Sequence, residues 1–149
     1  MAIQLDETNL AIIRHLIDGR ASFRKIADAL GVTENTVRSR VARLVKEDIL
    51  QISGLVDPER MDDHRLVMVG VKLNTMNLVK KGDEFSRLRG VVSVGVVTGR
   101  FDLILTVLLK KGFGLLEFYT EEVSKIQGVR AVETFVVYKS YGMKVPYIH

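Results

Sequence analysis

Residues 23–41 read FRKIADALGVTENTVRSRV, and this stretch predicts two short helices that meet at a sharp turn. Its apolar residues fall at helical spacings on the two sides of the turn: Ile26, Leu30, Val37 and Val41. Gly31 can adopt the positive φ that such a turn requires, and Thr33 is a good N-cap for the second helix. This pattern is typical of a helix-turn-helix, whose second helix enters the DNA major groove. A helical hairpin packed into a core is the alternative, because it would have the same apolar spacing.

The charge around this stretch favours DNA binding over a helical hairpin packed into a core. From Arg20 to Lys46 there are seven Lys or Arg and two acids, a local net charge of +5, whereas residues 1–60 carry nine of each sign. Such focused positive charge neutralises phosphates, so double-stranded DNA is the predicted partner. The side chains expected to face base edges are Glu34, Asn35, Arg38 and Ser39. The expected phosphate contacts are Arg24, Lys25, Arg40 and Arg43.

The flanking sequence completes a small domain. Asp6 can cap a helix that we expect to run to Gly19, where glycine favours a helix end. Downstream, the β-branched residues of Ile49–Val56 predict a strand, which Asp57-Pro58 ends. We therefore predict a winged or three-helix helix-turn-helix domain over residues 1–60.

Residues 61–149 have a different pattern, and the whole chain is predicted to be α+β. The expected strands are 65–73, 91–98, 102–109 and 129–138, and the expected helices are 78–88 and 113–126. The order βαββαβ gives a ferredoxin-like sheet with both helices on one face.

The strands of this second domain predict a partner for the sheet. Val67 and Val69 alternate with Leu66 and Met68, so the strand at 65–73 is apolar on both faces, and the strand at 102–109 is similar. Two helices cover one face only, and soluble monomers avoid exposing a broad apolar face. We expect a second copy to pack sheet to sheet, giving a homodimer. The alternative is a C-terminal tail that folds over the face.

The composition bounds the function classes. The chain has 149 residues, 47% of them hydrophobic, a net charge of +4 and no Cys. It contains no run of 18 apolar residues and no signal-peptide pattern, so we expect a cytoplasmic protein without a membrane partner. The histidines, His15, His64 and His149, lie in different segments, and no nucleophile, metal or phosphate-loop motif is present. We therefore expect no catalytic or metal-binding residues, and no enzyme.

The chain resembles the Lrp/AsnC (feast/famine) transcriptional regulators over nearly its whole length. The segments that carry the resemblance are 5–7, 12–13, 26–27, 30–32, 36–41 with Leu44, 56–58, 98–102 and 128–129. Asn9 stands where the family usually has Asp, and Asp48 stands where a Gly usually ends the recognition helix. Because Asp tolerates the left-handed conformation, the second change is compatible with the fold.

The resemblance implies a dimeric or octameric regulator whose C-terminal domain senses a small molecule, commonly an amino acid, between dimers near residues 98–102. Gly99 and Arg100 would hold the α-carboxylate through backbone amides, and Asp102 would pair with the α-ammonium. Thr134 and Val136 are candidates to contact the ligand side chain. No other cofactor is expected. From the residues alone, a simple hairpin turn is the alternative at this position.

Two other functions are compatible with parts of the sequence. Siroheme decarboxylases resemble Lrp-type proteins in fold, and such an enzyme would need a His and cations around a large tetrapyrrole pocket. A metabolic binding module without DNA is the other alternative, but the net charge of +5 around the predicted recognition helix argues against it.

Overall fold

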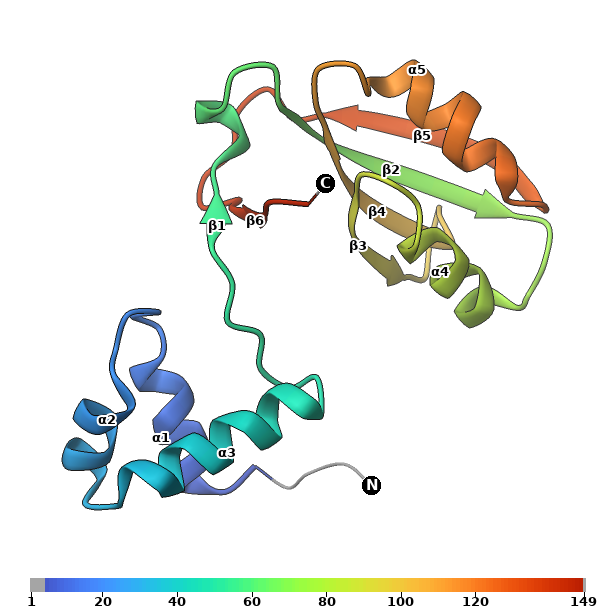
Figure 1. The fold of residues 1–149 in the computed structure, drawn as a ribbon. Coiled ribbons are helices and arrows are strands. Elements are labelled where there is room, and N and C mark those ends of the chain that lie inside the picture. The colour runs from blue at the N-terminus through green and yellow to red at the C-terminus, as the bar shows by residue number, and fades with distance from the viewer. Residues whose placement is uncertain (1–4, 149) are drawn as a thin grey trace. The chain divides into compact units, whose positions relative to one another are not determined.

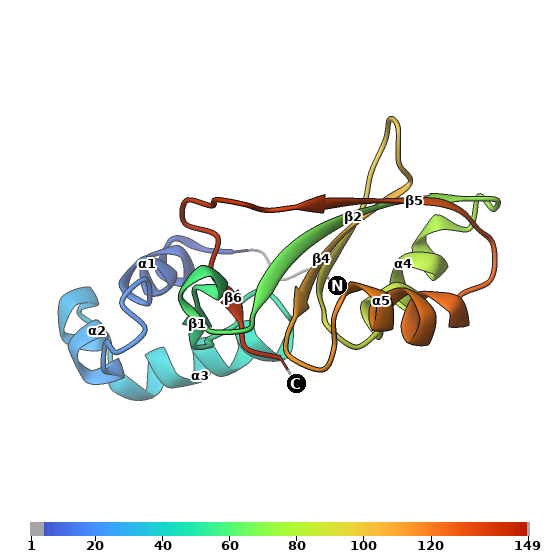
Figure 2. The ribbon, with the colours of Figure 1, turned by 90° about the horizontal axis from the view of Figure 1, so that it is seen from above.

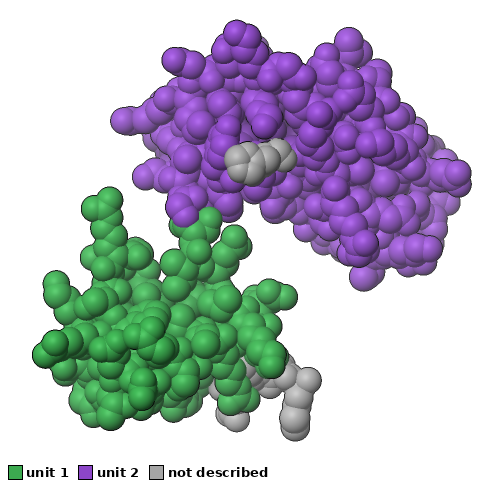
Figure 3. All heavy atoms as spheres, viewed as in Figure 1, with its two compact units in different colours: residues 1–53 green, residues 54–149 purple. Residues whose placement is uncertain are grey.

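The computed structural model describes residues 5–148, and the chain divides into two compact units, Met1–Ser53 and Gly54–His149 (Figure 3). The division falls before the residue 60 boundary expected from the sequence. The reason is that Leu55 and Val56 pair with a C-terminal strand and so belong to the second unit. None of the described helices is long and apolar enough to cross a membrane.

The first unit is the three-helix form of the predicted domain. Its helices are α1 (Glu7–His15), α2 (Phe23–Leu30) and α3 (Glu34–Lys46) (Figure 1). The buried residues at its centre are Ile12, Ile26, Ala27, Val37 and Val41. The side chains of Ser22 and Thr33 cap α2 and α3, accepting the backbone N–H groups of Lys25 at 3.3 Å and Thr36 at 3.2 Å. The predicted helix-turn-helix is therefore confirmed.

Helix α1 ends at His15, four residues before the expected end at Gly19. Leu16 already donates to the carbonyls of Ile12 and Ile13, which tightens the last turn. Ile17 is 87% exposed, so a further turn of helix would bury no apolar surface. With no packing to stabilise it, that turn does not form.

The sharp turns of the first unit use left-handed residues. Gly31 ends α2 with φ +65°, as expected, and Asp48 follows α3 with φ +53°. After Asp48 the backbone N–H groups of Ile49 and Leu50 bond to the carbonyl of Leu44, which closes the end of the helix. The strand predicted at 49–56 is therefore wrong over most of its length, and only β1 (Leu55–Val56) is a strand.

The second unit is built on one four-stranded antiparallel sheet. Its strands are β2 (Arg65–Leu73), β3 (Val91–Val96), β4 (Leu103–Leu109) and β5 (Val129–Val136), in the order β3-β4-β2-β5. Helix α4 (Leu78–Ser86) follows β2. The second helical segment consists of α5 (Leu115–Glu117), the π-helical η2 (Phe118–Glu122) and the 3-10 turn η3 (Val123–Lys125). Both helical segments lie on one face of the sheet (Figure 2), so the βαββαβ ferredoxin-like arrangement is confirmed.

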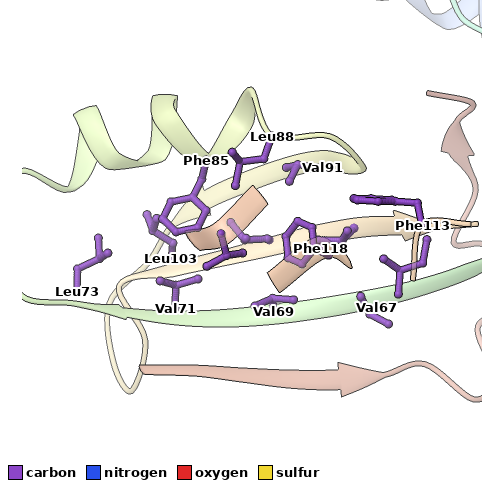
Figure 4. Close-up of a cluster of buried hydrophobic side chains, with 14 residues drawn as sticks. Val67, Val69, Val71, Leu73, Phe85, Leu88, Val91, Leu103, Phe113 and Phe118 are labelled. Carbon is purple, nitrogen blue, oxygen red and sulfur yellow. The ribbon is translucent and has the colours of Figure 1, made fainter. Parts of the chain in front are cut away.

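The main core lies between these helices and the sheet. Val67, Val69 and Val71 point from β2 into it, and Phe85 of α4 and Phe118 of η2 pack over them (Figure 4). All five side chains are at most 1% exposed. Alternate residues of β2 therefore face the helices, and the intervening residues face the opposite side of the sheet, which we call the open face.

The open face is covered at its two ends. At one end β1 pairs with β6 (Val145–Pro146), and Val145 packs against Leu66 and Leu108. A 3-10 turn, η1 (Pro58–Arg60), lies between β1 and β2 in the chain. At the other end the ring of Phe101 lies over Gly70, so close that a Cβ added to this glycine would come within 2.7 Å of the ring. The C-terminal tail, which was the alternative to a second copy as the cover of this face, thus covers one end of it.

The middle of the open face is less well covered. Met68 and Ile104 are half-buried there, and Phe135 is 47% exposed. Met68 lies directly across from Phe135 in the ladder between β2 and β5. An apolar strip therefore crosses the open face between the tail and Phe101.

Candidate DNA interface and effector turn

One exposed face of α3 carries most of the predicted base-reading residues. Asn35, Arg38, Ser39 and Ala42 line a shallow hollow on this helix. Their spacing of three and four residues places them on one side of the helix. All four are exposed, whereas Val37, Val41 and Leu44 on the other side are buried in the first unit.

The base-reading candidates Glu34 and Arg38 are already paired with each other. Arg38 Nη2 donates to Glu34 Oε1 at 2.6 Å, and the guanidinium lies 5.4 Å from the ring centre of Phe23. Both charged side chains remain about half exposed in this pair. Because an exposed pair of this kind is weak, either side chain can turn toward another partner.

The predicted phosphate contacts fall into two groups. Arg24, Lys25 and Arg43 are exposed, and within the described residues their side chains have no hydrogen bond or carboxylate partner. Arg40 is different, because its Nη1 donates to Asp6 Oδ2 at 2.6 Å and to Asn9 Oδ1 at 3.0 Å. The guanidinium of Arg40 holds the pKa of the Asp6 carboxyl below its ordinary value.

Arg40 therefore ties the start of α1 to α3. Asp6 also accepts the backbone N–H of Asn9 at 2.7 Å, so one carboxylate caps α1 and binds Arg40 at the same time. Asn9 is only 7% exposed. Sequence reasoning did not find this network, although a polar residue at position 9 within an apolar helical pattern was an available signal.

The predicted effector turn rises from the sheet between β3 and β4, on the side opposite to α4 and α5 (Figure 2). Its backbone is fixed at the base: Val97 N–H bonds to the carbonyl of Asp102 at 3.0 Å, and Asp102 N–H bonds to that of Val71 at 2.9 Å. At the tip, Gly99 has φ +116°, and apart from its two chain neighbours no residue has an atom within 4 Å of where a Cβ would stand. The backbone at Gly99 is therefore open to a ligand.

Asp102 lies beside a cation that sequence reasoning missed. Lys72 Nζ donates to Asp102 Oδ1 at 3.0 Å, and the backbone N–H of Leu73 donates to Oδ2 at 2.8 Å. These bonds, the one from Leu73 first, lower the pKa of Asp102. Lys72 of β2 and Asp102 thus form an ion pair at the base of the turn, whose tip has open backbone at Gly99.

Two residues of the last strand contact the turn within one chain, Glu133 and Phe135. Arg100 pairs with Glu133, and the Phe101 and Phe135 rings meet edge to face at 5.9 Å. Thr134 instead bonds to the Tyr119 hydroxyl at 2.6 Å, on the helix-covered side. Val136 lies opposite Val67, which also faces that side. Within one chain, Thr134 and Val136 therefore face the side of the sheet opposite to Glu133 and Phe135, because neighbouring strand residues face opposite sides. Their contact with a ligand held between dimers stays a prediction.

The two described histidines lie in different units. His15 is exposed on α1, His64 lies in the second unit just before β2, and His149 is outside the described residues. Between residues 5 and 148 there is no group of three or more His, Cys, Asp or Glu placed to hold a metal ion.

Comparisons with known proteins agree with both units. A family model described as an AsnC-type helix-turn-helix domain matches residues 5–45, and an Lrp/AsnC ligand binding domain matches residues 66–146. An uncharacterized HTH-type transcriptional regulator of Pyrococcus horikoshii is 32% identical over 137 residues, 91% of this chain and 87% of that protein.

Solved structures share the fold over most of the chain. The structure of E. coli AsnC aligns with a TM-score of 0.70 at 19% identity, covering 95% of this chain and 97% of that one. A transcriptional regulator from Neisseria meningitidis, in complex with L-Met, aligns with a TM-score of 0.68 at 18% identity, covering 91% of each chain. The chain therefore belongs to the Lrp/AsnC family of transcriptional regulators, with a helix-turn-helix DNA-binding domain and an Lrp/AsnC ligand-binding domain.

Proposed function

We propose that the protein regulates transcription from specific promoters by inserting α3 into the major groove. The observation that carries this proposal is the exposed face of α3, where Asn35, Arg38 and Ser39 lie together. Amide, guanidinium and hydroxyl groups are the side chains that read base edges. Glu34, at the start of the helix, is a further candidate once its pair with Arg38 opens.

We assign the phosphate contacts to the unpaired cations Arg24, Lys25 and Arg43. Their charges are available to displace counterions, which supplies sequence-independent affinity. Arg40 has a positioning role in this proposal, because its guanidinium is engaged by Asp6 and Asn9.

We infer that the effector is an amino acid that binds at the turn between β3 and β4. A zwitterion needs a cation for its carboxylate and an anion for its ammonium, and Lys72 and Asp102 form such a pair. The backbone N–H groups of Gly99, which stands in open space, and of Arg100 after it would add donors for the carboxylate. The relative from Neisseria meningitidis in complex with L-Met supports the ligand class.

We further propose that the chain forms a homodimer, and by further association an octamer, and that effector binding changes this assembly. The apolar strip on the open face, with Met68, Ile104 and half-exposed Phe135, is suited to a second copy of the same face. A ligand that contacts only the assembled form favours that form. A change in assembly would change the spacing between the recognition helices of the associated copies, and the affinity for DNA would change with it. The proteins from Pyrococcus horikoshii and Neisseria meningitidis are named transcriptional regulators, which favours a cytoplasmic regulator over an enzyme.

Calorimetry with the twenty amino acids tests the effector proposal. Asp102→Asn keeps an oxygen that can accept the Leu73 N–H but removes the charge, and Lys72→Gln removes the cation. We expect each variant to weaken binding at least tenfold, and Lys80→Gln, an exposed lysine on α4, to leave it unchanged. If one amino acid binds and neither variant alters its affinity, the assigned site is wrong. If none binds, the ligand class is wrong.

Sedimentation of the full chain tests the assembly proposal. Met68→Asp places a charge in the apolar strip, and Met76→Asp places the same charge on a side chain that is 90% exposed. A buried unpaired charge opposes association, so Met68→Asp should dissociate the dimer while Met76→Asp leaves it intact. A folded wild-type monomer at micromolar concentration would contradict the proposal.

A further inference from the structure

A second hollow lies at the far end of the sheet from the effector turn. It has a volume of about 490 Å³, within the range that small-molecule sites occupy. Its apolar lining comes from Val67, Leu109, Leu115 and Val136, which are all aliphatic and branched. Val136 is 39% exposed, so part of this surface is open to a ligand.

The charged part of the lining is mainly basic. Arg65, Lys110 and Lys111, which we call the basic rim, line the hollow together with one acid, Asp63. Lys111 Nζ lies 4.0 Å from Asp63, but Arg65 and Lys110 have no carboxylate partner among residues 5–148. At least two charges of the rim are therefore uncompensated.

The basic rim stands on fixed backbone. Lys110 and Phe113 exchange two backbone hydrogen bonds of 3.1 and 2.9 Å, and Gly112 supplies the φ of +76° that this tight turn needs. Arg65 lies opposite Leu109 in the ladder between β2 and β4. The cations are thus held near one another by the sheet and its turn.

His64 adds an unused polar atom to the lining. Its Nδ1 lies 2.7 Å from the carbonyl oxygen of Asp62, and because a carbonyl only accepts, Nδ1 carries a proton. Its Nε2 is buried and has no hydrogen-bond partner in the described part of the chain. In this tautomer Nε2 only accepts, so it offers no hydrogen bond to an ionised carboxylate, and the charge of an anion in the hollow is met by the basic rim.

We propose that this hollow binds a small aliphatic carboxylate. The carboxylate group would lie at the basic rim, and a short branched chain would cover Leu115 and Val136. Arg65 and Lys72 stand at opposite ends of β2, about 23 Å apart along an extended strand, so this site is separate from the effector turn. It needs no ammonium group on its ligand, and it does not depend on the proposed amino-acid site.

The test uses the full chain with isovalerate, a branched carboxylate that has no ammonium. Binding is measured by calorimetry and by chemical-shift changes, with 3-methylbutan-1-ol as the uncharged analogue and inorganic phosphate as an anion without an apolar part. Lys110→Ala/Lys111→Ala removes two charges of the basic rim on an exposed turn. Lys80→Ala/Arg130→Ala removes two exposed charges elsewhere in the second unit.

We expect isovalerate to bind and to shift signals of Leu115 and Val136. The rim variant should weaken it at least tenfold, whereas the control pair and Asp102→Asn should not. The alcohol and phosphate should bind at least tenfold more weakly than isovalerate. The proposal is overturned if isovalerate does not bind at millimolar concentration, if the rim variant binds it as well as the wild type, or if phosphate binds more tightly.

Discussion

Arg40 and Arg43 provide a sharp test of how α3 uses its charges. Both lie on the same helix, three residues apart, and both were expected from the sequence to contact phosphates. Arg43 is exposed without a described partner, whereas Arg40 is bonded to Asp6 and Asn9. We therefore expect Arg43→Ala and Arg40→Ala to weaken DNA binding for different physical reasons.

The magnitude follows from counterion release. Each phosphate contact contributes about 0.9 to the slope of log affinity against log salt. Between about 50 and 200 mM salt, a fourfold change, one contact accounts for about a 3.5-fold loss of affinity. Over this range of salt, the affinity of the wild type should fall about 3.5-fold further than that of Arg43→Ala. Where two α3 helices of a dimer bind one site, two contacts are lost and the difference becomes about 12-fold.

Arg40→Ala should leave the salt slope unchanged. It should lower the affinity at every salt concentration and lower the thermal midpoint, because α3 loses its tie to the cap of α1. Asp6→Asn weakens the same tie from the other side, so it should act in the same direction as Arg40→Ala. A double variant should add little, since both changes disrupt one interaction.

Fluorescence anisotropy with one duplex, titrated at several salt concentrations, gives the slopes, and thermal unfolding gives the midpoints. The positioning role of Arg40 is refuted if Arg40→Ala reduces the slope as much as Arg43→Ala and leaves the midpoint unchanged. It is also refuted if Asp6→Asn strengthens DNA binding, because that would mean that Asp6 only withholds a phosphate-binding charge.

Two further predictions concern stability. Gly70→Ala should lower the free energy of unfolding by ~1–3 kcal/mol, because its Cβ would meet the Phe101 ring at 2.7 Å; urea unfolding should show no such loss when Phe101→Ala is already present. Hydrogen bonds from Lys139 and Ser140 lower the pKa of Glu59 from 4.5 to about 2. A lowered pKa stabilises the folded form above the ordinary value of 4.5, and this gain is lost as the pH falls toward 2. The difference in thermal midpoint between wild type and Glu59→Gln should therefore be largest near neutral pH and shrink toward pH 2; a difference that does not change with pH would contradict this.

The parts of the fold that depend on local chemistry could be predicted from the sequence. A cap such as Ser22 or Thr33 bonds to a backbone N–H three residues away, so the residues that decide it are close in the chain. The same holds for Gly31 and Asp48, whose left-handed φ is a property of the single residue. The strand at 65–73 was predicted with its observed bounds because its apolar run is long and ends at Asn74.

The site details depend on contacts between distant residues, which the sequence pattern does not specify. Arg40 meets Asp6 across 34 positions, and Lys72 meets Asp102 across 30. The side of the sheet that Thr134 faces was not predicted, because a strand pattern does not fix the register, and a shift of one residue exchanges the two faces. The pairing of β1 with β6 was also not predicted, because each strand is only two residues long and is too short to show a pattern.

Selection from a pool of random duplexes, with the full-length protein, tests the central claim most directly. If α3 reads promoter sequence, the selected duplexes should share a pseudo-palindromic motif with half-sites about one helical turn apart. Arg38→Ala should relax that motif at one position of each half-site, and Arg43→Ala should weaken binding while leaving the motif unchanged. No enriched motif, or a motif that Arg38→Ala and Asn35→Ala leave unaltered, would contradict the assignment of α3 as the element that recognises DNA.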